Sequence, residues 1–136
     1  MRLNTHLTFN GQCRQAFEYY EMHLGGKIQF MMTYGESPMP AGPSDEWRTK
    51  IIHASFTLGN ELLTGADAPP EVYEKPQGMA VLFSVDAAAE ADRVFAALAE
   101  NGTVEFPIQE TFWALRFGML VDRFGTPWMI NCAKPA

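Results

Sequence analysis

Apolar residues recur along the chain with two different periods. In Leu3–Phe9 they alternate with polar residues, which is the spacing of a half-buried strand. In Cys13–Leu24 they recur every three or four residues, which predicts an amphipathic helix with one buried stripe. Gly25-Gly26 follows, and glycine readily takes the left-handed conformation that ends a helix. Asn10 lies between the strand and the helix, and its side chain is predicted to cap the helix N-terminus.

The other periodic segments predict a second helix and further strands. Helical spacing is found for Ala91, Val94, Phe95 and Leu98, with Asp86 as the expected cap and Asn101-Gly102 as the expected end. Strands are predicted at Ile28–Tyr34, Ile51–Leu58, Glu61–Gly65, Met79–Val85, Thr103–Phe106, Arg116–Val121 and Trp128–Ala133. Gly59-Asn60 suits a tight two-residue turn between two of these strands.

The order of elements occurs twice. Leu7–Asn10 matches Phe83–Asp86 at an offset of 76 residues, and Leu58–Leu63 matches Phe124–Met129 at an offset of 66. The Pro- and Gly-rich loop Gly35–Trp47 accounts for the difference, and it could be a lid over the ligand or an arm that holds a partner subunit. Such a repeat predicts an α+β fold of two βαβββ modules, residues 1–68 and 78–136, within a single domain of residues 1–136. The modules are expected to form a partly open, curled mixed sheet with both helices on its convex side.

Length and charge narrow the classes of function. A chain of 136 residues is long enough for one good hydrophobic core. Its net charge of −6 disfavours a nucleic-acid partner, because phosphate groups carry the same sign. No apolar run reaches the roughly 18–20 residues of a membrane span, and no signal-peptide core is found, so no membrane partner and a cytoplasmic location are expected. Cys13 and Cys132 are interpreted as buried thiols.

Several motifs resemble one known family. They are Leu7–Phe17, Ile52–Ala54, Gly65–Asp67, Glu110–Ala114, Phe117-Gly118, Asp122 and Phe124–Asn131. With them the chain resembles the PhnB-like branch of the vicinal oxygen chelate superfamily, the glyoxalase, bleomycin-resistance and dioxygenase group. Metal-dependent members hold a divalent ion with His, Gln or Glu side chains on the first and fourth strand of each module. The resemblance therefore implies that a metal site, if present, would lie at the corresponding positions here.

Those positions are Asn4, Leu63, Ala80 and Met129, counted from the repeat. Leucine, alanine and methionine are not ligands for a hard or borderline divalent ion. We therefore expect neither a metal nor another cofactor. A different ligand set, His6 with Glu61 and Asn131, remains the alternative.

Strand alternation also predicts which side chains face a ligand. Ala54, Phe56, Glu61 and Leu63 are expected on the concave face, with His53 turned away beneath the helices. Trp128 is expected to face the helices because it alternates with Met129. Trp113 lies in the segment Pro107–Leu115 and is expected at the rim of the site, where it can cover a flat ligand.

The favoured hypothesis is a metal-free small-molecule binding protein with an unknown physiological ligand. Its predicted ligand-binding residues are Asn4, His6, Glu61, Leu63, Trp113, Met129 and Asn131. The alternatives are a metal-dependent lyase, isomerase or dioxygenase built around His6, and an interaction module with a filled cleft. No catalytic residue is assigned, because the sequence lacks a nucleophile elbow and the glycine-rich turn of common methyltransferases. Exposed strand edges favour a homodimer.

Overall fold

The computed structural model describes residues 1–38 and 44–136, and residues 39–43 of the predicted Gly35–Trp47 loop lie outside this range. The chain divides into two compact units, Met1–Lys75 and Pro76–Ala136. The first unit contains β1 (Thr5–Phe9), α1 (Cys13–Leu24), β2 (Lys27–Thr33), a short 3-10 helix η1 (Asp45–Thr49), β3 (Ile51–Leu58) and β4 (Glu61–Asp67). The second contains β5 (Val81–Ser84), α2 (Ala88–Ala99), β6 (Thr103–Gln109), β7 (Ala114–Val121) and β8 (Pro127–Ala133).

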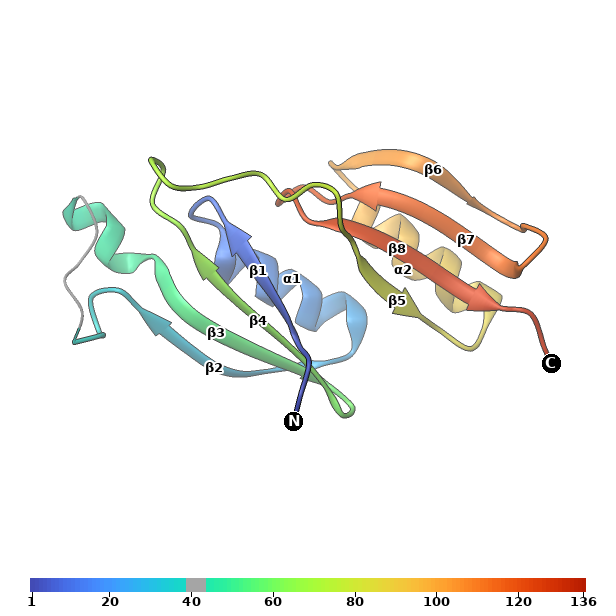
Figure 1. Ribbon diagram of the computed structural model, residues 1–136, viewed down its shortest axis with the longest axis horizontal. Coiled ribbons are helices and arrows are strands. Elements are labelled where there is room, and N and C mark those ends of the chain that lie inside the picture. Colours follow the sequence, from blue (N-terminus) through green and yellow to red (C-terminus); the bar gives the residue numbers. More distant parts are fainter. Residues whose placement is uncertain (39–43) are drawn as a thin grey trace. The chain divides into compact units, whose positions relative to one another are not determined.

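Each unit is one four-stranded mixed sheet with a helix on one face (Figure 1). The strand order is β1-β4-β3-β2 in the first sheet and β5-β8-β7-β6 in the second. Strand β1 runs parallel to β4, and β5 runs parallel to β8. All other neighbouring strands are antiparallel. The predicted α+β class and both βαβββ modules are therefore confirmed. The joining of the two modules into one curled sheet and a single domain stays a prediction.

The core of the first unit lies between α1 and its sheet. The Phe17 ring on α1 contacts Phe9 edge-on, with ring centroids 6.0 Å apart, and Phe56 in the same way at 6.2 Å. Gly65 on β4 gives this ring its space, because a Cβ atom there would lie 2.8 Å from two Phe17 ring atoms. Phe17 is fully buried, so a side chain at position 65 has no room.

The second unit repeats this arrangement with different residues. Leu120, Trp128 and Ile130 are buried on the side of the sheet that faces α2. Gly118 makes room for a helix residue, since a Cβ atom there would lie 2.6 Å from the Phe95 ring. The prediction that Trp128 faces the helix is confirmed. Its indole N–H donates to Asp122 Oδ2 at 2.9 Å, which satisfies the polar atom of this buried side chain.

Neither predicted helix cap is found. Gln12 precedes α1 and Ala87 precedes α2, and no side-chain cap is formed at either position. Gly11, with a φ of 91°, turns the chain after β1, so α1 starts beyond the reach expected of Asn10. The capping group comes from β4 instead: Asp67 Oδ1 accepts the Cys13 N–H at 2.9 Å.

Asp67 links three segments of the first unit. Its second carboxylate oxygen accepts the Ile51 N–H at 2.8 Å, and its backbone carbonyl accepts the Tyr34 hydroxyl at 2.7 Å. Burial raises the pKa of Asp67, while the backbone N–H groups and the nearby Lys50 charge act in the opposite direction. The carboxylate thus serves the architecture of the unit.

Candidate functional site

Each sheet has one face that its helix covers and an opposite face, which we call the open face. On the first open face one residue from each strand forms a row across the sheet, which we call the imidazole row. It consists of His6, Thr64, Ser55 and Phe30. Three of these four side chains are polar, so this open face offers imidazole and hydroxyl groups.

His6 is held in a defined orientation. Its Nδ1 atom and the Thr64 hydroxyl oxygen form a hydrogen bond of 2.7 Å across β1 and β4. Partial burial lowers the pKa of His6, and the nearby His53 lowers it further. The neutral imidazole is therefore favoured, with Nε2 as its second polar atom.

The predicted faces of β3 and β4 are wrong. Ala54 and Phe56 are buried against α1, and the register places Leu63 opposite Phe56 on that same side. Strand alternation then places Glu61 on this side too and His53 on the open face, where its ring lies 5.8 Å from that of Phe30. The reason is that Phe17 on α1 packs against the side of β3 that contains the small and aromatic residues Ala54 and Phe56.

The ligand set predicted around His6 is therefore not brought together within the first unit. Glu61 lies on the helix side of the first sheet and His6 on the open face. Asn131 belongs to the second unit. Within residues 1–38 and 44–136, no group of three or more His, Cys, Asp or Glu side chains has the arrangement of a metal site.

The positions that hold metal in the resembling superfamily do not fit a metal in this chain. His6 lies opposite Thr64, and Leu82 lies opposite Met129, so the counterpart of Met129 is Thr64 rather than Leu63. The corrected set, Asn4, Thr64, Ala80 and Met129, still contains no carboxylate, imidazole or thiolate. Asn4 itself lies just before β1 and is exposed.

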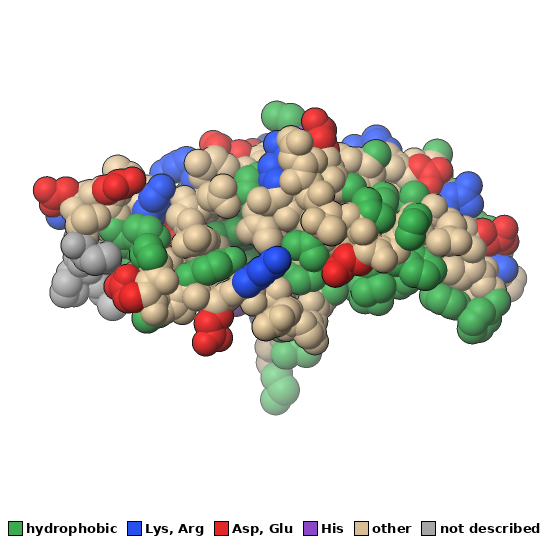
Figure 2. Space-filling view, turned by 90° about the horizontal axis from the view of Figure 1, so that it is seen from above, with side chains coloured by type: hydrophobic (Ala, Val, Ile, Leu, Met, Phe, Trp, Pro, Cys, Tyr) green, Lys and Arg blue, Asp and Glu red, His purple; other side chains and the backbone are tan. Residues whose placement is uncertain are grey.

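The second open face has a different character. Its first row, the apolar row, runs across all four strands as Leu82, Met129, Met119 and Phe106. Its second row, the mixed row, consists of Ser84, Asn131, Phe117 and Gln109. Figure 2 shows hydrophobic side chains gathered on the surface of the second unit, on the right of the view. These two rows combine a wide apolar area with hydroxyl and amide groups, which is typical of ligand sites.

Trp113 stands beside the mixed row. It lies at the tip of the β6–β7 hairpin, which is closed by hydrogen bonds from the Thr111 N–H to the Ala114 carbonyl and from the Ala114 N–H to the Thr111 hydroxyl. The Trp113 ring packs edge-to-face on Phe117 with centroids 5.3 Å apart, and on Phe112 at 4.8 Å. Trp113 is 48% exposed, whereas Phe117 beneath it is buried.

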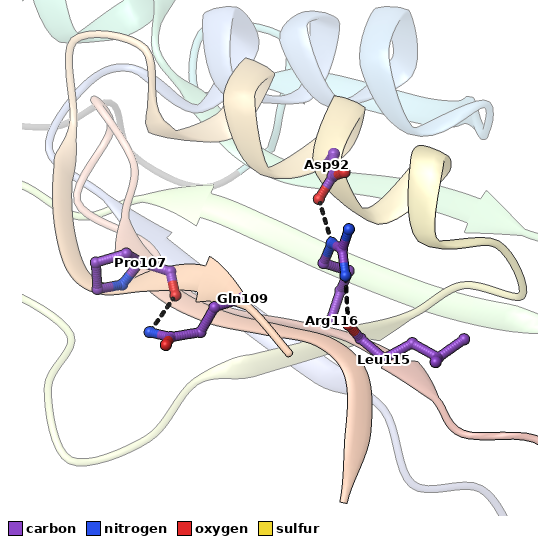
Figure 3. Close-up of polar contacts among 5 residues, drawn as sticks. All are labelled: Asp92, Pro107, Gln109, Leu115 and Arg116. Atoms are coloured by element: carbon purple, nitrogen blue, oxygen red, sulfur yellow. Dashed lines mark hydrogen bonds and ion pairs between the residues drawn. The ribbon is translucent and has the colours of Figure 1, made fainter. Parts of the chain in front are cut away.

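The charged side chain of β7, Arg116, is directed away from the open face. Figure 3 shows Arg116 pointing from β7 to α2, where its Nε atom donates to Asp92 at 3.1 Å. A second guanidinium nitrogen donates to the Leu115 carbonyl at 2.7 Å. The amide of Gln109 lies away from the helix and donates to the Pro107 carbonyl at 3.1 Å. The polar groups of the apolar and mixed rows are all uncharged.

Sequence reasoning found Trp113, Met129 and Asn131 on the second unit and missed the residues between them. Phe106, Phe117 and Met119 complete the two rows. Their signal was available, because Phe117 and Met119 alternate with Gly118, and a glycine inside an aromatic strand often marks close approach of another element. The first unit likewise has Thr64 and Ser55 beside His6, which were not selected.

None of the described helices is long and apolar enough to span a membrane.

The model of the family described as 3-demethylubiquinone-9 3-methyltransferase matches residues 1–131. Protein YjdN of Escherichia coli (strain K12) is 35% identical over 142 residues, which cover 98% of this chain and 97% of that protein.

Solved structures agree with this match. The crystal structure of protein PA1353 from Pseudomonas aeruginosa is 44% identical, covers 99% of both chains and superimposes with a TM-score of 0.91. A glyoxylase/bleomycin resistance protein/dioxygenase domain from Frankia sp. EAN1pec shares the fold at 15% identity, with a TM-score of 0.64 and coverage of 98% of each chain. The chain therefore belongs to the PhnB-like family described by the 3-demethylubiquinone-9 3-methyltransferase model, and it has the fold of the glyoxalase, bleomycin-resistance and dioxygenase proteins.

Proposed function

We propose that the protein binds a small planar aromatic molecule on the second open face without using a metal ion. The observation that carries this proposal is the exposed Trp113 ring, which packs against Phe117 and Phe112. The apolar row beside it provides further contact area, and Asn131 provides a polar anchor. The donor chemistry at the superfamily's metal positions supports the metal-free part of the proposal.

The indole groups of the protein allow a direct test. The chain has three tryptophans, and Trp47 and Trp128 are 7% and 1% exposed while Trp113 is 48% exposed. In nitrogen-15 NMR spectra, added 2-naphthamide, 2-methylnaphthalene, 2-naphthoate or 2-naphthylmethylammonium is expected to shift the Trp113 indole signal. The shift should persist in excess EDTA, because no metal takes part in binding.

Two variants make this test specific. Trp113→Ala should abolish saturable binding in calorimetry, because it removes the ring that covers Phe117. Met22→Ala, which truncates a 76% exposed apolar side chain on α1, should leave binding unchanged. If none of the four probes moves the Trp113 signal, the proposal is wrong. If EDTA abolishes binding, its metal-free part is wrong.

The proposal also includes a cytoplasmic homodimer, as expected from the sequence. It is supported by exposed apolar side chains of the second unit that lie outside the two rows, among them Met79 at 68% and Val104 at 47%. Such side chains become more favourable when a second copy covers them. Light scattering after size-exclusion chromatography should give twice the chain mass of 15.2 kDa, and a mass of one chain would contradict this part.

A further inference from the structure

We propose that the ligand of the second open face is an uncharged planar ring with a carboxamide or similar carbonyl group at its edge. This inference rests on the proposed function and adds the chemical class of the ligand to it. It follows from two observations on the second unit, the arrangement of amides in the mixed row and the pairing of every basic side chain.

The mixed row places amide groups on both sides of an aromatic ring. Phe117 on β7 lies opposite Asn131 on β8 and opposite Gln109 on β6. A planar ligand that stacks on the exposed Trp113 ring, above the buried Phe117, would therefore have amide groups next to its edge. The flat apolar surface and the polar edge select a ring with a hydrogen-bonding substituent.

The two amides offer complementary atoms. The Asn131 side chain makes no hydrogen bond with another described residue, so both its N–H donors and its carbonyl oxygen are available. Gln109 uses one N–H of its NH2 group on the Pro107 carbonyl, which leaves its second N–H and its own carbonyl oxygen for a ligand. A carboxamide can donate to one of these groups and accept from the other, whereas a hydrocarbon can do neither.

Charge pairing argues against an ionic ligand. Residues 76–136 contain four Lys or Arg side chains, and each already has an acidic partner. The pairs are Arg93–Glu90, Arg116–Asp92, Arg123–Glu100 and Lys134–Glu110. The apolar and mixed rows contain neither a basic nor an acidic residue. An ion on this face would lose hydration without gaining an opposite charge, and that loss is costly.

Isosteric probes test this inference on the full chain. 2-Naphthamide, 2-naphthoate and 2-naphthylmethylammonium share one ring system and differ in charge, and 2-methylnaphthalene lacks the hydrogen-bonding group. We expect 2-naphthamide to bind at least about tenfold more tightly than either ion in calorimetry, because only the ions lose charge hydration. We also expect the Trp113 indole signal to shift with 2-naphthamide.

Substitution of Asn131 tests whether its side-chain amide binds the carboxamide of the ligand. Asn131→Leu keeps the approximate size of the side chain and should weaken 2-naphthamide binding about tenfold without weakening 2-methylnaphthalene binding. Asn60→Leu is the matched control, because it makes the same change at an exposed turn of the first unit and should alter neither. Circular dichroism spectra of both variants should equal that of the unchanged chain.

The outcomes separate this inference from the proposed function. If an ion binds as tightly as 2-naphthamide while the Trp113 signal shifts, the proposed function stands and the ligand class is wrong. The same conclusion follows if Asn131→Leu weakens the amide and the hydrocarbon equally. If no probe shifts the Trp113 signal, both proposals are wrong.

Discussion

His6 and Thr64 face each other across two parallel strands, and a hydrogen bond of 2.7 Å joins the His6 Nδ1 atom to the Thr64 hydroxyl. The bond fixes one nitrogen of the ring, and partial burial with the nearby His53 lowers the pKa of His6. The position of His6 on an open face, together with its neutral form, makes it the most informative titratable residue of the first unit.

The lowered pKa of His6 predicts how stability depends on pH. An unfolded histidine takes up a proton around its ordinary pKa of 6.5, whereas the folded state binds that proton more weakly. The unfolded state thus holds more protons as the pH falls below 6.5, so the free energy of unfolding should decrease there. His6→Gln should lose less stability than the unchanged chain between pH 7.5 and pH 5.5 in urea denaturation. Equal losses of stability in both chains would contradict the lowered pKa of His6.

Thr64→Val tests the same hydrogen bond from the other side. Valine keeps the shape of threonine but cannot bond to the His6 ring. We expect a loss of about 0.5–1 kcal/mol in the free energy of unfolding at pH 7.5, the range for one partly exposed hydrogen bond. Thr57→Val on β3 is the comparison, because it removes the hydroxyl that accepts a hydrogen bond from the Gln29 amide on β2. It should not change the pH dependence of the free energy of unfolding. A Thr64→Val chain as stable as the unchanged one would show that the bond has no net value.

Asp67→Asn should destabilise the first unit. The carboxylate accepts backbone N–H groups of Cys13 and Ile51 at 2.9 and 2.8 Å, and an amide has only one acceptor atom for both. Leaving a buried N–H without an acceptor costs about 1–3 kcal/mol in the free energy of unfolding. Asp92→Asn, at an exposed ion pair, is the control and should cost less than about 1 kcal/mol.

The same residue predicts a second pH effect. Burial raises the pKa of Asp67, so the folded state holds its proton more strongly than the unfolded state. Its contribution to stability should therefore decrease as the pH rises through the interval between the ordinary pKa of 3.8 and the raised folded value. Subtracting the Asp67→Asn curve from that of the unchanged chain isolates this slope, and a slope of opposite sign would refute the raised pKa.

Gly65→Ala should disturb the packing of α1 on its sheet. The new Cβ atom would lie 2.8 Å from the buried Phe17 ring and 3.2 Å from Phe9. Overpacking of this kind costs about 1–3 kcal/mol in the free energy of unfolding. Gly59→Ala is the control for backbone strain, because Gly59 has open space around it but a φ of 58°. It should lower the free energy of unfolding by about 1 kcal/mol. Thermal unfolding of the two variants measures the difference, and a smaller effect at Gly65 would contradict the packing argument.

Local periodicity predicted most elements because each depends on residues close together in sequence. The helix at Cys13–Leu24 and the strand at Ile51–Leu58 have the predicted bounds. Strand β6 extends to Gln109, beyond the predicted end at Phe106, because after a register shift its pairing with β7 resumes at Gln109, opposite Phe117. The caps failed for a similar reason: Asn10 was the nearest suitable residue, but Asp67, far along the chain, provides the acceptor.

The strand faces were likewise predicted only in part from local alternation. Alternation identified Glu61 and Leu63 as neighbours on one face, and that grouping is right. It could not identify which face α1 covers, because Phe17 packing on Phe56 and Gly65 decides that. On β8 the decision was correct for Trp128 and Met129, since a large indole with a polar atom favours the buried side where Asp122 accepts its N–H.

The sequence by itself determined the class of fold, the order of elements in each module and the unsuitable donor chemistry at the superfamily's metal positions. These follow from residue types and from spacing over short distances. Only the tertiary structure decided that Thr64 is the partner of His6, that Glu61 faces the helix and that Phe117, against which Trp113 packs, lies between two amides. The physical reason is that strand register and helix packing join residues far apart in the chain, and short-range periodicity contains no information about which of them meet.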